Sequence, residues 1–126
     1  MDKINKRILV VDDDPDILDA MKLTLETNGY KVDIFEKGEG LSDKLIHSNF
    51  YPDLIILDVF LSGTNGKEVC RQLKDNIKTK HIPVLMVSAH PDLSRSIQDI
   101  NASGFLAKPF EVHDLLKKVN ENVSTK

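Results

Sequence analysis

The stretch Pro52-Asp53-Leu54-Ile55-Ile56-Leu57-Asp58 decides the fold of this 126-residue chain. Its four consecutive apolar residues run directly into an aspartate. A short unbroken run of this kind is typical of a strand buried on both faces, because no 3.6-residue periodicity extends through it as a helix would require. Open α/β sheets bind their ligands at the carboxyl ends of their strands. Asp58 is therefore the first candidate for a functional residue.

Strands and helices are predicted to alternate along the rest of the chain. Besides the central stretch, strand patterns cover residues 7–11, 30–35, 83–88 and 105–107. Five groups of apolar residues at helical spacing lie between and after the strands: Ile17, Leu18, Met21 and Leu25; Leu41, Leu45 and Ile46; Val69, Cys70, Leu73 and Ile77; Leu93, Ile97 and Ile100; Val112, Leu115, Leu116, Val119 and Val123. This alternation predicts a parallel sheet with helices on both faces. Residues 59–65 are expected to form a loop.

Length, composition and charge limit the class of protein. A chain of 126 residues, 40% hydrophobic and 29% charged, is expected to form one soluble domain. A net charge of −3 provides no basic surface for nucleic acid. The first apolar run, residues 8–11, is too short for a signal peptide or a membrane span. A single cysteine, Cys70, excludes an internal disulfide and favours a cytoplasmic protein in which this thiol is buried.

Polar residues follow four of the predicted strands. Asp12 and Asp13 follow the first strand, Asp58 ends the third, Ser88 ends the fourth and Lys108 follows the fifth. Parallel strands open on one rim, so these side chains are expected to meet there. Three neighbouring carboxylates repel each other unless one is protonated or a cation lies among them. Oxygen ligands without histidine or cysteine favour Mg²⁺ or Mn²⁺, which leaves positions open for phosphate oxygens.

A cation, a lysine and a hydroxyl together indicate a site for a phosphoryl group. Asp58 is then the natural nucleophile, since a carboxylate can accept a phosphoryl group as an acyl phosphate. Taken singly, each residue has a simpler interpretation: an acidic run after a strand is often a helix cap or a solvated loop. Asp14, followed by Pro15, is indeed read as a helix cap. The combination at successive strand ends favours the phosphoryl site.

These residues resemble the receiver domain of two-component response regulators, over about residues 6–122. The motifs that carry the resemblance are Ile8-Leu9-Val10-Val11-Asp12-Asp13-Asp14, the central stretch, Val87-Ser88-Ala89 and Phe105-Leu106-Ala107-Lys108-Pro109-Phe110. The resemblance implies a flavodoxin-like (βα)5 three-layer sandwich whose five-stranded parallel sheet has the order 2-1-3-4-5. Residues 1–126 would then form a single receiver domain.

The resemblance also implies a role for each site residue. Asp58 matches the phosphorylated aspartate. Asp13 matches a direct Mg²⁺ ligand, Asp12 acts through a metal-bound water, and the backbone carbonyl of Phe60 completes the protein ligands. Lys108 pairs with the phosphoryl group. The remaining matches are a switch hydroxyl, a switch aromatic residue and a proline that usually follows a cis peptide bond: Ser88, Phe105 and Pro109.

By this resemblance, the protein accepts a phosphoryl group from a phosphohistidine on a sensor histidine kinase or a histidine phosphotransfer protein. It is not a conventional enzyme, but it catalyses its own phosphorylation and dephosphorylation. Ser88 moves toward the phosphoryl group and Phe105 rotates into the vacated space. The surface of the fourth helix, fifth strand and fifth helix changes as a result, and it contacts a downstream target or a second copy in a phosphorylation-dependent homodimer.

Some positions depart from the usual family pattern, and two others are expected to affect the rate at which the acyl phosphate is hydrolysed. Ser62 replaces the usual proline, and Asn101 and Gly104 replace a commoner glycine and aspartate. Phe60 and His90 each lie two residues beyond a site residue, where side chains flank the path of the water that hydrolyses the acyl phosphate. His90 also has the simpler interpretation of an exposed loop residue.

Three alternatives remain open from the sequence. Asp12-Asp13-Asp14 superficially fits the signature of a haloacid-dehalogenase-type phosphohydrolase, but Asp16 stands where that signature has Thr or Val. No second acidic pair follows Lys108, and the chain is short for a substrate cap. A receiver-like module that is never phosphorylated is the second alternative. The third, a flavodoxin-like FMN binder, is disfavoured because the acidic residues would repel its phosphate.

Overall fold

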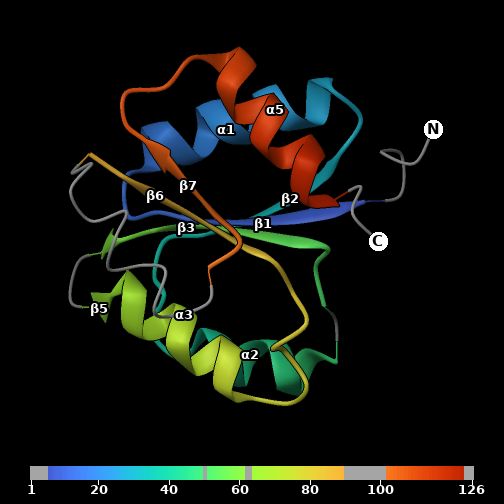
Figure 1. The fold of residues 1–126 in the computed structure, drawn as a ribbon, viewed down its shortest axis with the longest axis vertical. Helices are drawn as coiled ribbons and strands as arrows, with labels where there is room; N and C mark the ends of the chain where they lie inside the picture. The colour runs from blue at the N-terminus through green and yellow to red at the C-terminus, as the bar shows by residue number, and fades with distance from the viewer. Residues whose placement is uncertain (1–5, 50, 62–63, 90–101, 124–126) are drawn as a thin grey trace.

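Five parallel strands form the central sheet of the computed structural model (Figure 1). The structure describes residues 6–49, 51–61, 64–89 and 102–123. The strand order is β2-β1-β3-β6-β7, which confirms the expected 2-1-3-4-5 topology. The strands are β1 (Arg7–Val11), β2 (Lys31–Phe35), β3 (Leu54–Asp58), β6 (Val84–Ser88) and β7 (Gly104–Ala107).

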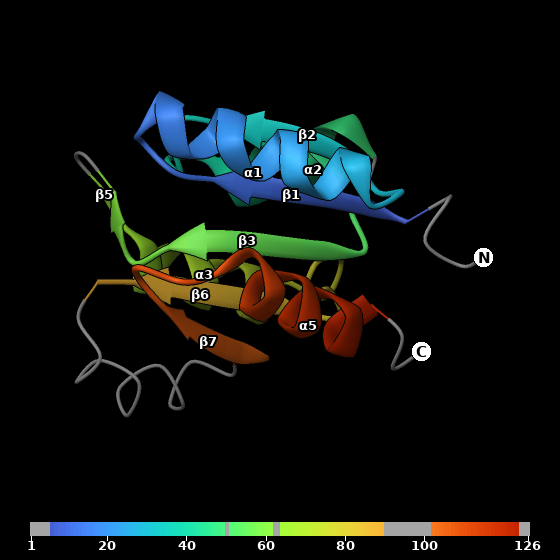
Figure 2. The same cartoon turned by 90° about the horizontal axis from the view of Figure 1, so that it is seen from above.

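Helices cover both faces of this sheet and complete the three layers. One face carries α1 (Pro15–Thr27) and α5 (Val112–Val123), and the other carries α2 (Leu41–Ser48) and α3 (Gly66–Asp75) (Figures 1 and 2). Over the first face, α1 lies on the β1 and β2 side and α5 on the opposite side (Figure 2). The expected helix around residues 93–100 lies outside the described residues. In the described part of the chain, no helix is long and apolar enough to cross a membrane.

The central strand β3 is buried along its whole length, as its apolar run predicts. Successive side chains of a strand point to opposite faces. Leu54 and Ile56 accordingly join the core cluster beneath α1 and α5, whereas Ile55 and Leu57 join the cluster above α2 and α3. The two cores therefore meet at β3, and Asp58 lies at the strand's carboxyl end.

Side-chain caps fix where two helices begin. The Asp14 carboxylate accepts a hydrogen bond of 2.9 Å from the backbone N–H of Asp16, and Pro15 occupies the first turn of α1. This confirms Asp14 as a helix cap. The Asn65 side chain accepts a similar bond of 2.8 Å from the backbone N–H of Lys67 at the start of α3. Both caps satisfy N–H groups that the helix itself cannot pair.

The segment after β3 differs from the expected loop. Two short strands, β4 (Phe60–Leu61) and β5 (Thr64–Asn65), pair antiparallel before α3 begins. Strands of two residues are too short to produce an alternating sequence pattern. The chain between Asp58 and α3 is therefore tied to itself by backbone pairing.

The prediction that Ile77 belongs to the buried face of the third helix is wrong. Helix α3 ends at Asp75, and Ile77 is 79% exposed. Asn76 has extended backbone angles, and its side chain accepts a 2.9 Å hydrogen bond from the N–H of Lys78. The chain thus turns away from the helix axis before Ile77. Val112 does lie in the predicted last helix, as the first residue of α5, but its side chain is 56% exposed.

Cys70 is buried on α3 within the core, as expected. Burial raises the pKa of its thiol to about 11, although the nearby positive charges of Lys74 and Arg71 lower it in part. Since the thiolate is the reactive form of cysteine, this residue is inert at neutral pH. Cys70 is therefore a packing residue.

Leu73 and Ile77 provide a direct test of where α3 ends. Leu73 is fully buried, so Leu73→Ala is expected to lower the free energy of unfolding by about 2–5 kcal/mol. Ile77→Ala is expected to change it by less than about 0.5 kcal/mol, because the side chain is exposed. Urea unfolding followed by circular dichroism measures both values. Equal losses in the two variants would contradict the assigned end of the helix.

Candidate functional site

The parallel sheet brings three distant residues together at the carboxyl ends of its strands. Asp12 follows β1, Asp58 ends β3 and Lys108 follows β7. The Lys108 ammonium lies 3.1 Å from Oδ2 of Asp12 and 3.3 Å from Oδ2 of Asp58. These contacts join residues that are 96 and 50 positions apart in the chain. The structure thus gathers the predicted residues at one rim of the sheet.

Asp13 completes a cluster of three carboxylates. One oxygen from each of Asp12, Asp13 and Asp58 lies within 4.8 Å of the other two. Asp12 and Asp58 are buried, whereas Asp13 is exposed. Oxygen ligands of this kind suit a hard divalent cation, which keeps several bound waters when only a few carboxylates hold it. The donor set therefore fits Mg²⁺ or Mn²⁺, and the exposed side at Asp13 leaves an approach for solvent or substrate.

Lys108 supplies the positive charge that the acidic cluster needs. Burial alone would lower the pKa of its ammonium group. The hydrogen bond to Asp12 and the negative charge of Asp58 raise it by more, so that the pKa of Lys108 lies above its ordinary value. The side chain therefore stays protonated at neutral pH. A fixed cation beside a carboxylate is well placed to bind the oxygens of a phosphoryl group.

Backbone contacts hold Asp12 and Lys108 in these positions. Oδ1 of Asp12 accepts a 2.9 Å hydrogen bond from the N–H of Asp14, and the N–H of Asp12 donates to the Phe35 carbonyl at 3.2 Å. The N–H of Lys108 donates to the Ser88 carbonyl at 2.8 Å. The peptide bond between Lys108 and Pro109 is cis, as the sequence resemblance implies. Groups held in this way keep their geometry before any ligand binds.

Of the other residues that the sequence predicts for the site, the structure describes the positions of Ser88, Phe105 and Phe60. Ser88 is fully buried at the carboxyl end of β6, the strand next to β3. Phe105 lies on β7, partly buried against the core cluster on the α2 and α3 face. Phe60 pairs through its backbone with Asn65 in the short hairpin. His90 lies outside the described residues, as do Ser62 and Asn101.

Gly66 is a positioning residue that the sequence reasoning missed. A Cβ atom at this position would lie 2.1 Å from the carbonyl oxygen of Asp58 and 2.8 Å from Cα of Val59. The N–H of Gly66 also donates to the Val59 carbonyl at 2.7 Å. The first turn of α3 thus packs directly on the backbone of the candidate nucleophile. The sequence signal was a glycine immediately before a helical pattern, which resembles an ordinary loop ending.

An apolar hollow adjoins the acidic cluster. It has a volume of about 340 Å³ and is lined by Ile17 of α1, Ala89, and the segment from Lys108 through Pro109 to Phe110. Lys108 therefore borders both the carboxylates and this hollow. The acidic cluster is therefore bordered by an apolar surface on the side of Lys108.

Comparison with known families identifies the type of domain. Residues 8–120 match the family model described as the response regulator receiver domain. The chain is 38% identical over 115 residues to the DNA-binding dual master transcriptional regulator RpaA of Synechocystis, covering 90% of this chain and 47% of that protein. It is 34% identical over 122 residues to the transcriptional regulatory protein ResD of Bacillus subtilis, covering 94% and 49%. The chain thus spans about half the length of these relatives.

Solved structures show the same fold. A putative response regulator from Chloroflexus aurantiacus matches with a TM-score of 0.87 and 29% identity, over 95% of this chain and 98% of that one. The response regulator TrrA of Thermotoga maritima, solved in complex with Mg²⁺ and BeF, matches with a TM-score of 0.80 and 33% identity, over 92% and 97%. The fold is therefore that of a receiver domain.

Gly66→Ala tests the close approach between α3 and Asp58. The added methyl group would collide with backbone atoms, so the variant is expected to lose about 1–3 kcal/mol of unfolding free energy. Gly104→Ala is the control, because its Cβ would approach side-chain atoms and no backbone: Cδ1 of Leu85 at 3.3 Å and Nδ2 of Asn122 at 3.9 Å. Urea unfolding of the two variants provides the measurement. A smaller loss for Gly66→Ala than for Gly104→Ala would contradict the assigned contact.

Proposed function

Because the chain belongs to the receiver-domain family of two-component response regulators, we propose that Asp58 accepts a phosphoryl group from a phosphohistidine of a sensor histidine kinase or histidine phosphotransfer protein. The observation that carries this proposal is the Lys108 ammonium, which lies 3.1 Å from Asp12 and 3.3 Å from Asp58. This contact places a cation beside a buried carboxylate at the sheet rim. The family match gives no support to the alternative of a haloacid-dehalogenase-type phosphohydrolase.

In the proposed reaction, a carboxylate oxygen of Asp58 attacks the phosphorus atom of the phosphohistidine. The new O–P bond forms as the P–N bond breaks, and the imidazole nitrogen leaves with the bonding electrons. Lys108 holds its positive charge against the phosphoryl oxygens while this exchange takes place. The product is an acyl phosphate on Asp58, which water later hydrolyses. The protein thus catalyses its own modification without a conventional enzyme's turnover of substrate.

The metal ligands in this proposal are Asp12, Asp13, Asp58 and the backbone carbonyl of Phe60. The three clustered carboxylates support this assignment, as does the presence of Mg²⁺ in the TrrA complex. Mg²⁺, when bound, supplies charge that stabilises phosphoryl oxygens. Asp13, the exposed member, is the ligand that solvent and substrate can reach. The buried Asp12 is already held through both oxygens, because Oδ1 accepts from the N–H of Asp14 and Oδ2 contacts the ammonium of Lys108.

The donor protein is proposed to dock on the apolar hollow beside Lys108. Ile17, Ala89, Pro109 and Phe110 line this hollow, and their position brings a bound donor within reach of Asp58. An apolar contact next to a charged site favours protein association, because binding energy comes from burial while the charges select the reacting group. The cytoplasm, where sensor kinases present their phosphohistidine, is the proposed location.

The output of the switch is proposed to run through Ser88 and Phe105. Ser88 is buried on the strand next to Asp58, so a small movement would bring its hydroxyl to a phosphoryl group. Phe105 has no hydroxyl, and its partly buried ring depends on packing alone. β7 and α5 then form part of the changed surface, with residues 90–101 outside the described structure. A downstream protein or a second copy of the chain would bind there.

Replacing the nucleophile tests the proposed reaction. Incubation with acetyl phosphate and Mg²⁺ is expected to add one phosphoryl group to the wild-type chain, as seen by intact mass spectrometry. Asp58→Ala is expected to abolish this adduct, because no carboxylate remains at the end of β3. Asp75→Asn, a change of an exposed aspartate at the end of α3, is the control and should be labelled normally. Stoichiometric labelling of Asp58→Ala would place the nucleophile elsewhere.

The lifetime of the acyl phosphate is proposed to depend on Phe60, with His90 in a similar role. Phe60 follows Asp58 by two residues, so its bulky apolar side chain is expected to shield the acyl phosphate from water. Phe60→Asn should therefore dephosphorylate severalfold faster, whereas Phe60→Leu, which stays apolar, should remain close to the wild-type rate. Loss of the phosphorylated mass after removal of acetyl phosphate gives each rate. An unchanged or slower rate in Phe60→Asn would contradict the shielding role.

A further inference from the structure

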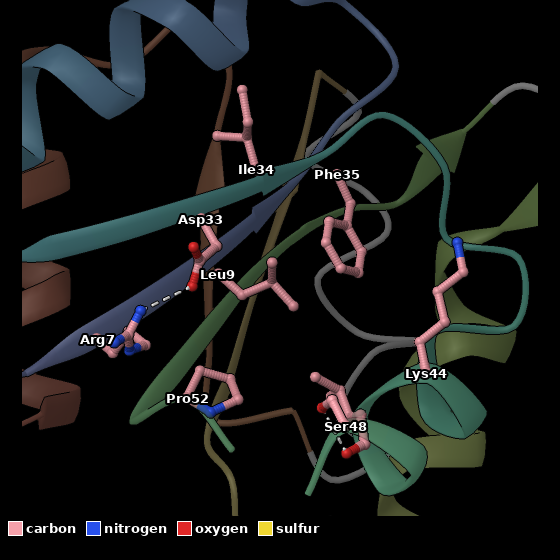
Figure 3. A pocket seen from close by; sticks show the side chains of 9 residues that line it. Arg7, Leu9, Asp33, Ile34, Phe35, Lys44, Ser48 and Pro52 are labelled. Carbon is pink, nitrogen blue, oxygen red and sulfur yellow. Dashed lines mark hydrogen bonds and ion pairs between the residues drawn. The ribbon is translucent and has the colours of Figure 1, made fainter. Parts of the chain in front are cut away.

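A second hollow lies on the opposite side of the sheet from α1, at the edge formed by β2. It has a volume of about 300 Å³, at the lower end of the range for small-molecule sites. Leu9, Leu45 and Pro52 give it a buried apolar base. Figure 3 shows the ring of Phe35 pointing into the same space from β2. None of these residues belongs to the acidic cluster.

The fold leaves this hollow open because of the side chains that β2 presents. Val32 and Ile34 pack against the core beneath α1 and α5, and Figure 3 shows Ile34 pointing away from the hollow. Asp33 and Phe35 therefore face α2, by the alternation of the strand. Helix α2 is only eight residues long and packs beside α3. The hollow therefore lies between β1 and β2 on one side and α2 on the other, where Lys44, Leu45 and Ser48 line it.

Among the described residues that line the hollow, Lys44 is the positive group that no ion pair neutralises. Arg7 and Asp33 form an ion pair with 3.4 Å between Nη1 and Oδ2, so they largely neutralise each other. The ammonium of Lys44 lies 5.4 Å from the centre of the Phe35 ring. Lys44 is exposed on α2 and can turn toward a ligand. A cation held over an aromatic face is attracted weakly enough to exchange that contact for an anion.

We propose that this hollow binds a small amphipathic carboxylate: an aromatic or branched aliphatic acid. The apolar body would lie against Phe35 and the base formed by Leu9 and Leu45. The carboxylate would bind the ammonium of Lys44. A ligand amine is disfavoured, because Lys44 already occupies the aromatic face and Arg7 already neutralises Asp33. A polyphosphate is disfavoured too, since one available lysine cannot balance its charge.

Three probes with one apolar body and different head groups test this proposal: 4-isopropylbenzoate, 4-isopropylbenzamide and 4-isopropylbenzylamine. Titration is followed by ¹⁵N–¹H NMR of the wild-type chain. The benzoate is expected to bind with a Kd of about 1 mM, as suits a ligand of this size, and to shift the amide signals of Leu9, Phe35 and Leu45. The benzamide should bind about fivefold more weakly, because it lacks the charge-assisted contact. The benzylamine should bind most weakly.

Matched variants separate the two parts of the site. Lys44→Gln is expected to reduce benzoate affinity to that of the benzamide, while leaving the benzamide unchanged. Lys117→Gln, a change of an exposed lysine on α5, should leave the preference for benzoate intact. Phe35→Leu should weaken the benzoate and the benzamide alike. Phosphorylation plays no part in this experiment, so its outcome is independent of the proposed role of Asp58.

Four results would overturn the proposal. The first is equal affinity of the wild-type chain for benzoate and benzamide. The second is an unchanged preference in Lys44→Gln. The third is a set of NMR shifts centred on Ala89 and Phe110, which would place the probe in the hollow beside Lys108. Absence of any shift at millimolar probe concentrations counts against the site in the same way.

Discussion

The balance of charge at the sheet rim is the constraint on which the rest of the site depends. A parallel sheet places the ends of its strands together, and here two of those ends carry buried carboxylates. Buried charges of like sign are unfavourable unless a counter-charge lies among them. Lys108 provides it, since its ammonium contacts both Asp12 and Asp58. The ammonium of Lys108 therefore compensates the negative charge that the fold gathers at this rim.

That balance also explains why the surrounding backbone is held so closely. A shift of the Lys108 ammonium would leave a buried carboxylate without its partner, which is costly. The Ser88 carbonyl fixes the backbone of Lys108, and the N–H of Asp14 fixes one oxygen of Asp12. Gly66 brings α3 against the backbone of Asp58. Each of these contacts involves at least one main-chain group, so the backbone of the fold holds the site residues in place.

The sequence predicts those features that depend on local patterns and strand order. Apolar runs located the sheet, and the residues after each run located Asp12, Asp58 and Lys108, because parallel topology fixes where strand ends lie. Periodicity failed at Ile77, where the apolar spacing continues although Asn76 turns the chain. The approach of Gly66 to Asp58 could not be predicted, because a glycine's neighbours across the fold leave no trace in its own sequence context.

The hollow at the β2 edge could not be predicted from the sequence, and a backbone hydrogen bond links it to the acidic cluster. Its openness depends on how far α2 extends over β2, which is a tertiary property that no single segment encodes. Phe35, whose ring faces this hollow, accepts through its carbonyl the hydrogen bond from the N–H of Asp12. One backbone contact therefore joins the hollow to the acidic cluster. If a ligand on Phe35 and a phosphoryl group near Asp12 favour different positions of this strand pair, each must alter the affinity for the other by the same factor.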